Sequence, residues 1–462
     1  MRVMKFGGTS LSDGDMFVRV ANVVKNTGGE KIVILSAVKG VTDIISEHVL
    51  DFRALDVASE RADTIKKKHM EILDRIFLIL GHEKNNEVYS DSVEKINMLH
   101  NKYERLLYGV AYIDEMSPAS RDILLSMGER FSTVLMEAAL RLIGLKASAV
   151  ESDTIGLVTD GVFGKATAII EECEFNLRET IIPMLENGTV PVITGFFGSD
   201  SEGRTTIFGR NGSDYGAAVV ARSVKADRLE IWKTVDGFMT GNPDIIEDSR
   251  IIDNLSYEEA AELAYFGARV LHPRCVEPIS RMNIPIYVKN VFKPEERGTI
   301  ISGESPTINN IIKSVALMNG LSMLRIYGAG AGYTSGLFAK IFGVLGERDI
   351  SVYSSATTQT SFTIVIDEKK ESEAIAALNM IREKIFVEIT PFNDKSLICV
   401  VGRGMRTARG LVARLFSSVA SAGVNIETIS AGASKVAFNF IVSRKDADAA
   451  LKAVHSEFFN DF

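Results

Sequence analysis

The feature that most constrains the fold is an internal repeat in the last third of the chain. The same pattern occurs at residues 327–342 and at residues 401–416, with an offset of 74 residues. It consists of a Gly-x-Gly turn, a further glycine, and then a basic residue followed by an apolar residue and Phe. The copies continue to residues 349–350 and 425–426, where the offset is 76. Each copy reads as strand, glycine turn, helix, strand and strand, a unit of about 70 residues that buries only a modest core by itself. We therefore expect two small units that pair with each other.

Upstream of the repeat, apolar strand-like runs alternate with helical patterns. Short runs rich in β-branched residues occur at residues 31–38, 189–194 and 229–232, and helical stretches such as residues 214–223 lie between them. Buried parallel strands have this composition because both of their faces are covered. Residues 42–112 contain no proline and space their apolar positions as a helix does, which predicts a helical insertion or cap. The whole pattern predicts an α/β fold with a mainly parallel sheet.

Length and charge limit the number of domains and the kinds of partner. A chain of 462 residues exceeds what one core usually supports, so two to three domains are expected, with a linker in the Pro-, Glu-, Gly- and Ser-rich residues 293–309. A net charge of −8 argues against nucleic acid or an anionic membrane as a partner. Cys173, Cys275 and Cys399 lack the spacing of a metal site and read as reduced thiols. With no apolar leader or membrane-length run, we expect a cytoplasmic protein without a metal site of its own.

The first ten residues form a pattern typical of a phosphate-binding turn. Lys5 ends a predicted first strand and is followed by Phe6, Gly7 and Gly8. Glycines have no Cβ, so their backbone N–H groups can approach an anionic oxygen closely, and a helix predicted downstream points its positive end at the same place. By itself, the pattern fits an ordinary strand and turn equally well.

Two further clusters place charged and hydroxyl groups next to glycine turns. Residues 208–215 hold Arg210, Ser213 and Asp214 in a glycine-rich loop before a predicted helix. Arginine offers a planar fork to a carboxylate or phosphate, and a fixed aspartate can orient a lysine or a metal. The same loop also fits a solvated turn in which Ser213 or Asp214 caps the helix. Residues 232–243 read as a strand that runs into a long turn, the place where ligands bind in open α/β sheets.

Taken together and in this order, the clusters resemble the signature segments of aspartate kinases, members of the amino-acid kinase family. The matching segments are residues 5–10, 36–42, 126–130, 209–215 and 264–273. The repeat resembles the paired ACT domains of these enzymes, in which one ACT unit is inserted within the other. The resemblance implies an amino-acid kinase catalytic domain with a mainly parallel central sheet at residues 1–295, followed by two ferredoxin-like (ACT) α+β domains at residues 309–462. The first ACT copy is expected at about 320–392, and the second at about 309–319 plus 393–462.

The resemblance also implies a reaction, its cofactors and its regulation. The reaction is ATP-dependent phosphorylation of the β-carboxylate of L-aspartate to 4-phospho-L-aspartate, with Mg²⁺ on the ATP, at the start of lysine, threonine and methionine biosynthesis. The acceptor carboxylate is already ionised at neutral pH, so charge neutralisation rather than a strong base must dominate catalysis. Lysine or threonine is expected as an effector, in a monofunctional enzyme that forms a homodimer or a higher homo-oligomer. Two alternatives stay open: a kinase of this family with another acceptor, and an ACT-type amino-acid sensor without catalysis.

Site residues follow from the resemblance by position. The expected catalytic residues are Lys5, Arg210 and Asp214. The expected substrate-binding residues are Ser36, Thr42, Glu129, Arg210 and Ser213, with Glu129 facing the α-ammonium and Arg210 the α-carboxylate. The expected ATP-binding residues are Lys5, Phe6, Gly7, Gly8, Lys233, Thr234, Asp236, Met239, Arg269 and Val270. The expected effector-binding residues are Asp349, Ile350, Asn425 and Ile426.

Two observations qualify these assignments. Relatives commonly have Thr-Asp after the tryptophan and Tyr later in the turn, where this chain has Lys233-Thr234 and Met239. We therefore expect Lys233 to contact a phosphate or the ribose. Glu129 also has a plainer interpretation, as a helix-surface ion pair with the neighbouring Arg130.

Overall fold

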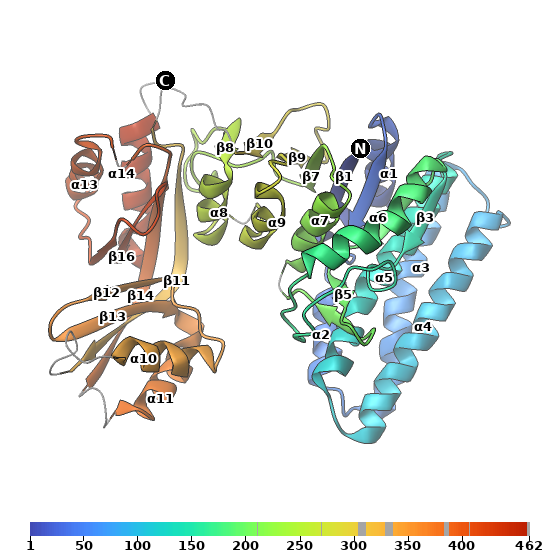
Figure 1. Ribbon diagram of the computed structural model, residues 1–462, viewed down its shortest axis with the longest axis horizontal. Helices are drawn as coiled ribbons and strands as arrows, with labels where there is room; N and C mark the ends of the chain where they lie inside the picture. Colours follow the sequence, from blue (N-terminus) through green and yellow to red (C-terminus); the bar gives the residue numbers. More distant parts are fainter. Residues whose placement is uncertain are drawn as a thin grey trace. The chain divides into compact units, whose positions relative to one another are not determined.

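The computed structural model describes residues 1–209, 211–268, 270–303, 311–328, 336–382, 388–405 and 407–459 (Figure 1). The chain divides into two compact units, which are described separately. The first unit comprises Met1–Phe238, Asp253–Tyr257 and Val270–Ser305, and the second comprises Met239–Ile252, Glu258–Arg269 and Pro306–Phe462. The short segment Met239–Ile252 therefore belongs to the second unit although the residues before it belong to the first.

Within the described residues, the first unit is built on an eight-stranded sheet of order β3-β4-β2-β1-β7-β9-β10-β8. The strands are β1 (Arg2–Phe6), β2 (Lys31–Leu35), β3 (Ala147–Val150), β4 (Val190–Thr194), β7 (Arg228–Lys233), β8 (Asn254–Ser256), β9 (Ile286–Asn290) and β10 (Thr299–Ser302). All neighbouring strands run parallel except β9 and β10. The expected α/β fold with a mainly parallel sheet is confirmed.

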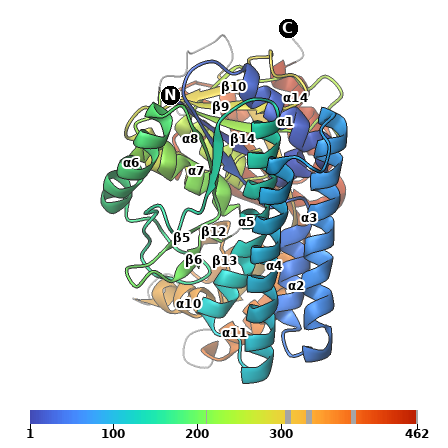
Figure 2. The same ribbon diagram turned by 90° about the vertical axis from the view of Figure 1, so that its right-hand side faces the viewer.

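Helices cover this sheet, and two of the longest, α3 and α4, pack on α5 as a further helical layer. They are α1 (Gly14–Asn26), α2 (Val41–Leu50), α3 (Ala58–Leu80), α4 (Glu87–Ile113), α5 (Pro118–Leu142), α6 (Ile170–Glu186), α7 (Gly212–Ser223) and α9 (Val276–Ser280). Figure 2 shows α3 and α4 running along each other, as the proline-free residues 42–112 predict. Shorter elements of the unit are η1 (Gly8–Leu11), η2 (Leu55–Val57), η3 (Pro273–Cys275), and the hairpin β5 (Phe197–Ser199) and β6 (Thr205–Ile207).

Helix α5 occupies the centre of the first unit. Ser117 caps it by accepting a hydrogen bond from the Ser120 backbone N–H, and Pro118 takes the first helical position, where no N–H is needed. Every residue from Leu124 to Leu140 is buried. The helix is therefore held on all sides, and a polar side chain on it is fixed in position by its surroundings.

The second unit is an antiparallel sheet that carries two similar halves. Its order is β12-β13-β11-β14-β16-β15 within the described residues, with β11 (Ser314–Tyr327) and β14 (Glu388–Val401) paired along their length. The other strands are β12 (Ser354–Thr357), β13 (Ser361–Asp367), β15 (Thr428–Ser430) and β16 (Ala437–Ser443). Its helices are α8 (Tyr257–Tyr265, of which Tyr257 belongs to the first unit), α10 (Leu337–Gly346), α11 (Glu371–Asn379), α13 (Leu411–Ser421) and α14 (Ala447–Phe459), with η4 (Glu368–Lys370) and η5 (Arg444–Asp446).

The internal repeat has the predicted order of elements. One copy is β11, α10, β12 and β13, and the other is β14, α13, β15 and β16. Each half has its own apolar core, one around Leu324 and Ile341 and the other around Val400 and Leu415. The glycine turn of the first copy includes residues 329–335, which lie outside the described residues. The long strands β11 and β14 join the two halves into one sheet, so the expected pairing of the copies is confirmed.

The expected linker at residues 293–309 is partly wrong. Strand β10 lies in this range and pairs antiparallel with β9 and parallel with β8, so it belongs to the central sheet. Thr299 and Ile301 are buried and alternate with half-buried Ile300 and Ser302. This β-branched alternation outweighs the flanking Pro and Gly. Residues 304–310 lie outside the described residues.

One buried histidine makes the first unit sensitive to acid. His69 of α3 is fully buried, its ring stacks on Phe131 with 4.6 Å between centroids, and its Nδ1 lies 2.7 Å from the Ile65 carbonyl oxygen. Burial lowers the pKa of His69 to about 4 from its usual 6.5. Below pH 6.5 the unfolded chain therefore binds the proton more readily than the folded protein, and stability falls until the pH reaches about 4.

We expect this histidine to cost the wild-type protein about 3 kcal/mol of unfolding free energy between pH 7 and pH 4, from the size of the pKa difference. A His69→Leu variant cannot titrate and is expected to lose less stability over the same range. Urea unfolding of both proteins at several pH values measures the difference. Parallel pH curves for the two proteins would contradict a buried, neutral His69.

Among the residues that the structure describes, no helix combines the length and the apolar composition needed to cross a lipid bilayer.

Candidate active site

Three charged side chains meet at the carboxyl ends of β1 and β7. Lys5 lies near the end of β1, Lys233 is the last residue of β7, and Asp214 stands in the first turn of α7. The two strands are parallel neighbours, with Phe6 opposite Trp232, so both lysines reach the same edge of the sheet. Lys5 Nζ lies 2.5 Å from Asp214 Oδ1, and Lys233 Nζ lies 3.4 Å from Asp214 Oδ2.

The charges in this cluster do not balance. Burial alone would raise the pKa of the Asp214 carboxyl, but the positive charges of Lys233 and Lys5 outweigh it and lower the pKa to about 2. Burial lowers the pKa of the Lys5 ammonium, and Asp214 opposes that effect. Two ammonium groups thus contact one carboxylate, and each ammonium has three N–H donors, which leaves donors for a further anion. Such a cluster attracts an anion such as a phosphate.

The double glycine lies directly beside these lysines. A Cβ added at Gly7 would stand 3.5 Å from Lys5 Nζ and 3.9 Å from Lys233 Nζ, and one at Gly8 would stand 3.1 Å from the Ala37 carbonyl oxygen. The backbone at Gly7 is extended, with φ −83°. Close packing therefore favours glycine at position 8, whereas a side chain at position 7 would cover the two ammonium groups.

A chain of polar contacts joins Glu129 of α5 to the same helix start. Glu129 Oε1 accepts a hydrogen bond from Ser213 Oγ at 2.6 Å, and Ser36 Oγ donates to Ser213 Oγ at 3.1 Å. Glu129 Oε2 accepts from the backbone N–H groups of Gly195 and Phe196 at 2.6 and 2.7 Å. Burial raises the pKa of the Glu129 carboxyl to about 7, although these donors and the charge of Lys5 partly oppose the increase. The carboxylate is therefore poised to gain from a cation placed beside it.

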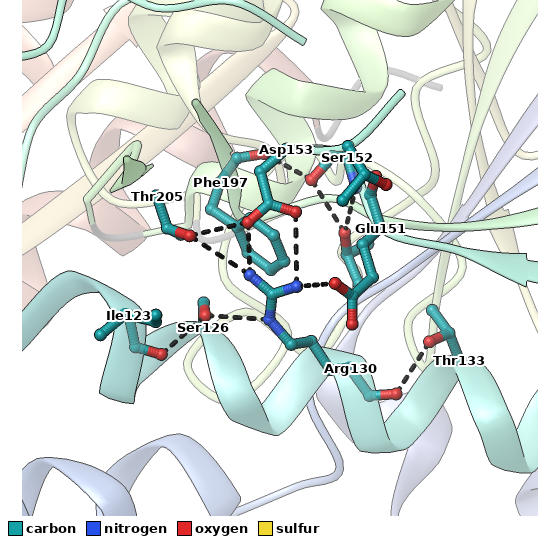
Figure 3. A network of polar contacts seen from close by, with 11 residues as sticks. Ile123, Ser126, Arg130, Thr133, Glu151, Ser152, Asp153, Phe197 and Thr205 are labelled. Carbon is teal, nitrogen blue, oxygen red and sulfur yellow. Dashed lines mark hydrogen bonds and ion pairs between the residues drawn. The ribbon is translucent and has the colours of Figure 1, made fainter. Parts of the chain in front are cut away.

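Arg130 has a different role from the one its position next to Glu129 suggests. Its guanidinium group forms ion pairs with Glu151 and Asp153 and stacks over the Phe197 ring at 4.4 Å (Figure 3). In the described part of the chain, Arg130 makes no ion pair with Glu129, so the plainer interpretation of Glu129 as a helix-surface ion pair is wrong. Arg130 instead fixes α5 against β5 and the segment after β3, and this anchors the turn of helix that carries Glu129.

For some predicted residues, no contact with this cluster is found in the described part of the chain. Thr42, on α2, is exposed, and Asp236 is held by Asn290 Nδ2 at 2.5 Å and Lys293 Nζ at 2.9 Å. Met239 belongs to the second unit, whereas half-buried Thr234 and Val270 belong to the first. Arg210 and Arg269 lie outside the described residues. In the described residues no group of three or more metal-ligating side chains is found.

The predicted effector residues lie in both halves of the second unit. Ile350 is buried in one core, and Ile426 packs against the other. Asp349 has a positive φ of 53°, in the turn after α10, and Asn425 is exposed. Strands β12 and β15, which follow these two pairs of residues, lie next to each other.

Gly195 and Phe196, the backbone donors to Glu129, are not among the residues predicted from the sequence. A signal for them exists, since Gly195 directly follows the buried strand β4. A Cβ at Gly195 would lie 2.7 Å from Ile34 Cγ2 and 3.0 Å from Ser213 Cβ. A glycine at the carboxyl end of a fully buried strand therefore marks a close approach of backbone to the site.

Comparison with known proteins identifies the class of both units. The amino acid kinase family model matches residues 1–290, and ACT domain models match residues 318–380 and 398–458. The first unit is thus an amino acid kinase domain, and the second contains two ACT domains.

Relatives narrow the class further. Aspartokinase 3, chloroplastic, of Arabidopsis thaliana is 31% identical over 99% of this chain and 81% of its own length, and the lysine-sensitive aspartokinase 3 of Escherichia coli is 29% identical over 99% of both. The crystal structure of E. coli aspartokinase III with aspartate and ADP matches with a TM-score of 0.82 at 29% identity, over 99% of this chain and 100% of that one. Its complex with lysine and aspartate gives 0.81 at 28% identity, over 99% of both. The chain belongs to the aspartokinase family, which confirms the resemblance of its motifs.

Proposed function

We propose that the protein transfers the γ-phosphoryl group of ATP to the β-carboxylate of L-aspartate. The observation that carries the proposal is the convergence of Lys5 and Lys233 on the single buried carboxylate of Asp214, next to Gly7, which has no side chain to cover them. The E. coli relative with a similar fold was crystallised with aspartate and ADP, which supports the same pair of ligands for this chain.

The two lysines act on the triphosphate. Both reactants are anionic, so the barrier is dominated by repulsion between the acceptor carboxylate and the phosphate oxygens. An ammonium group in a buried site stabilises the charge on the transferring oxygens by about 3 kcal/mol, the magnitude known for single donors in oxyanion sites. Asp214 contacts both ammonium groups and holds them in position. Mg²⁺ is expected to arrive on the ATP phosphates, where Asp214 can contact it.

The second group of residues binds the amino acid. The Glu129 carboxylate is proposed to pair with the α-ammonium of aspartate, and Ser36, Thr42 and Ser213 to supply hydroxyl contacts. Arg210 is proposed to bind the α-carboxylate from the loop before α7. Ser213 donates a hydrogen bond to Glu129, and the next residue, Asp214, pairs with Lys5. These contacts support an amino-acid site directly beside the phosphate site.

The remaining ATP contacts are proposals from the resemblance. Phe6, Gly7, Gly8, Lys233 and Thr234 lie at or near the edge of the sheet where the lysines meet, and they are proposed to line the nucleotide site. Asp236, Met239, Arg269 and Val270 are proposed to complete it. The division into a catalytic domain at residues 1–295 and an ACT region at 309–462, a homodimer or higher homo-oligomer, and a cytoplasmic location also remain proposals.

The effector is proposed to be lysine or threonine, bound near Asp349, Ile350, Asn425 and Ile426. The adjacency of β12 and β15 supports this site, because strand ends and backbone amides there can capture the charged groups of an amino acid. The E. coli relatives named for lysine support the same class of ligand. Each amino acid is to be added to a steady-state assay, and indifference to both at millimolar concentration would overturn the regulatory proposal.

The reaction is tested by an acceptor screen with Mg·ATP. Hydroxylamine traps acyl phosphates as hydroxamates, so aspartate is expected to give a hydroxamate that depends on both ATP and enzyme. Glutamate, N-acetylglutamate and nucleoside monophosphates serve as alternative acceptors, with ADP release as the readout. Turnover with one of these and none with aspartate would change the assigned acceptor. No ADP release with any acceptor would favour a sensor without catalysis.

The pH dependence of the reaction tests the role of Glu129. Because burial raises the pKa of this carboxyl to about 7, it becomes neutral below that pH and can no longer pair with the α-ammonium. We expect kcat/KM for aspartate to fall about tenfold per unit as the pH drops below 7, as for any single essential base. Rate profiles between pH 5.5 and 9 measure this. A profile that stays flat through pH 7 would remove Glu129 from ammonium binding.

A further inference from the structure

The first unit contains a second cationic cavity that the proposed reaction does not use. Its volume is about 640 Å³, within the range of small-molecule sites. Strands β1, β7 and β9 form its floor, helix α1 forms one wall, and residues 291–295 form the other. Among the described residues that line it, none belongs to the Lys5, Asp214 and Glu129 clusters.

The floor of the cavity is a buried carboxylate surrounded by guanidinium groups. Arg228, Glu230 and Trp232 point to the same face of β7, because they are two residues apart. Glu230 is 2% exposed and accepts hydrogen bonds from Arg228 Nε at 2.7 Å and Trp232 Nε1 at 3.1 Å. Arg2 lies opposite Arg228 in the neighbouring strand, with its guanidinium 3.7 Å from Glu230. Two guanidinium groups thus share one carboxylate, which leaves one positive charge on the floor.

Two further cations of the cavity are held by aromatic rings rather than by carboxylates. Lys289 Nζ lies 5.1 Å from the centre of the Trp232 ring, and the Arg19 guanidinium lies 4.9 Å from the centre of the Phe292 ring. In the described part of the chain, neither cation has a carboxylate within ion-pair distance. Burial lowers the pKa of Lys289, although Glu230 partly opposes the effect, so an added anion would further favour its charged form. The N–H groups of Arg19 and Lys289 are thus held in place by aromatic rings, without a carboxylate partner among the described residues. Groups arranged in this way can bind an anion.

The carboxylates at the rim do not compensate this excess. Asp15 is engaged by Arg75, whose Nε and Nη2 lie 2.8 and 2.9 Å from its two oxygens. Glu295 is exposed to solvent at the opposite rim. With Asp15 neutralised in this way, the four cations Arg2, Arg19, Arg228 and Lys289 face the two carboxylates of Glu230 and Glu295. The excess of two positive charges matches a phosphate monoester, which carries between 1.5 and 2 negative charges near pH 7, as a general property of that group.

We propose that this cavity is a binding site for a small phosphate monoester. Arginine forks suit phosphate oxygens, and the amides of Asn22 and Asn26 on the α1 wall can donate to the ester's hydroxyl groups. The site is separate from the nucleotide site, since Lys233 points from the end of β7 to Asp214 while Trp232 lies on the cavity floor.

The chain provides its own reporter for the test, because Trp232 is the only tryptophan. The full-length protein is saturated with Mg·ADP and aspartate to fill the proposed active site, and is then titrated with glycerol 2-phosphate at constant ionic strength. We expect a saturable change in tryptophan emission and a matching heat of binding by calorimetry, with no response to glycerol. The double variant Arg19→Gln/Lys289→Gln is expected to bind at least tenfold more weakly, with unchanged circular dichroism.

A matched control variant distinguishes binding in the cavity from a general effect of positive charge on the protein surface. Lys102→Gln removes an exposed lysine of α4 and is expected to leave the affinity unchanged. The proposal is overturned if the wild-type protein shows no saturable heat up to tens of millimolar ligand, or if the cavity variant binds as the wild type does. It is also overturned if Lys102→Gln weakens binding as much as the double variant. Because no turnover is measured, the result does not depend on the proposed kinase reaction.

Discussion

Replacement of Lys5 by methionine is expected to lower kcat between about 100- and 1000-fold, the loss known for removal of a single donor from an oxyanion site. Methionine keeps a similar length and apolar stem, so the end of β1 should pack as before. What is lost is the ammonium group 2.5 Å from Asp214. In the proposed reaction, that group neutralises the phosphate oxygens as charge builds on them, so the effect should appear in kcat more than in the KM for aspartate.

Lys233 supplies the matched comparison. Its ammonium group stands on the other oxygen of Asp214 at 3.4 Å, and its side chain is 20% exposed, where that of Lys5 is 5% exposed. Because water screens it more, Lys233→Met is expected to reduce kcat by a smaller factor and to raise the KM for ATP. Steady-state kinetics of both variants provides the test. A Lys5→Met enzyme with kcat within threefold of the wild type would contradict the proposed role.

The second large effect is expected for Glu129→Gln, with a rise of about 100-fold in the KM for aspartate. Removal of one partner from a buried ion pair costs between about 2 and 5 kcal/mol of binding free energy. Glutamine has nearly the same shape. Its carbonyl oxygen can accept from the Gly195 and Phe196 N–H groups while its amide nitrogen donates to Ser213 Oγ, so the change mainly removes charge. The KM for ATP should stay close to the wild-type value, because the proposed phosphate site lies at Lys5 and Lys233.

The control for this variant lies on the same helix. Glu137 is also buried on α5, but it pairs with Lys95 at 2.9 Å rather than with the residues of the site. Glu137→Gln removes the charge of this ion pair, so it is expected to lower stability and to leave both KM values unchanged. If Glu129→Gln raised the KM for ATP and for aspartate by the same factor, Glu129 would have to be a structural residue. Initial rates at varied concentrations of each substrate distinguish the outcomes.

The parts of this protein that sequence could predict are those set by local pattern. The apolar runs at residues 31–38 and 229–232 became β2 and β7, and the repeat became two equivalent halves of one sheet. Lys5 and Asp214 are more than two hundred positions apart in sequence, but each lies beside a glycine turn at the end or start of a regular element. Parallel strands bring such ends together, and this is why their contact could be anticipated.

The parts that sequence could not predict depend on which segments approach each other. Arg130 stands next to Glu129 in sequence, yet it turns to Glu151 and Asp153, because successive helix residues point in different directions. Strand β10 was not predicted because proline and glycine flank it in sequence. Its pairing with β8 and β9 makes it part of the central sheet. The amides of Gly195 and Phe196 carry no side-chain signal, although they hold the Glu129 carboxylate.

The proposed reaction depends on one arrangement, in which two ammonium groups hold the nucleotide phosphates beside an aspartate bound by Glu129. A crystal structure of the protein with Mg·ADP and aspartate tests this directly. We expect Lys5 and Lys233 Nζ within hydrogen-bond distance of phosphate oxygens, and Glu129 within the same distance of the aspartate ammonium. A complex with its phosphates away from both lysines, or with aspartate bound away from Glu129, would contradict it.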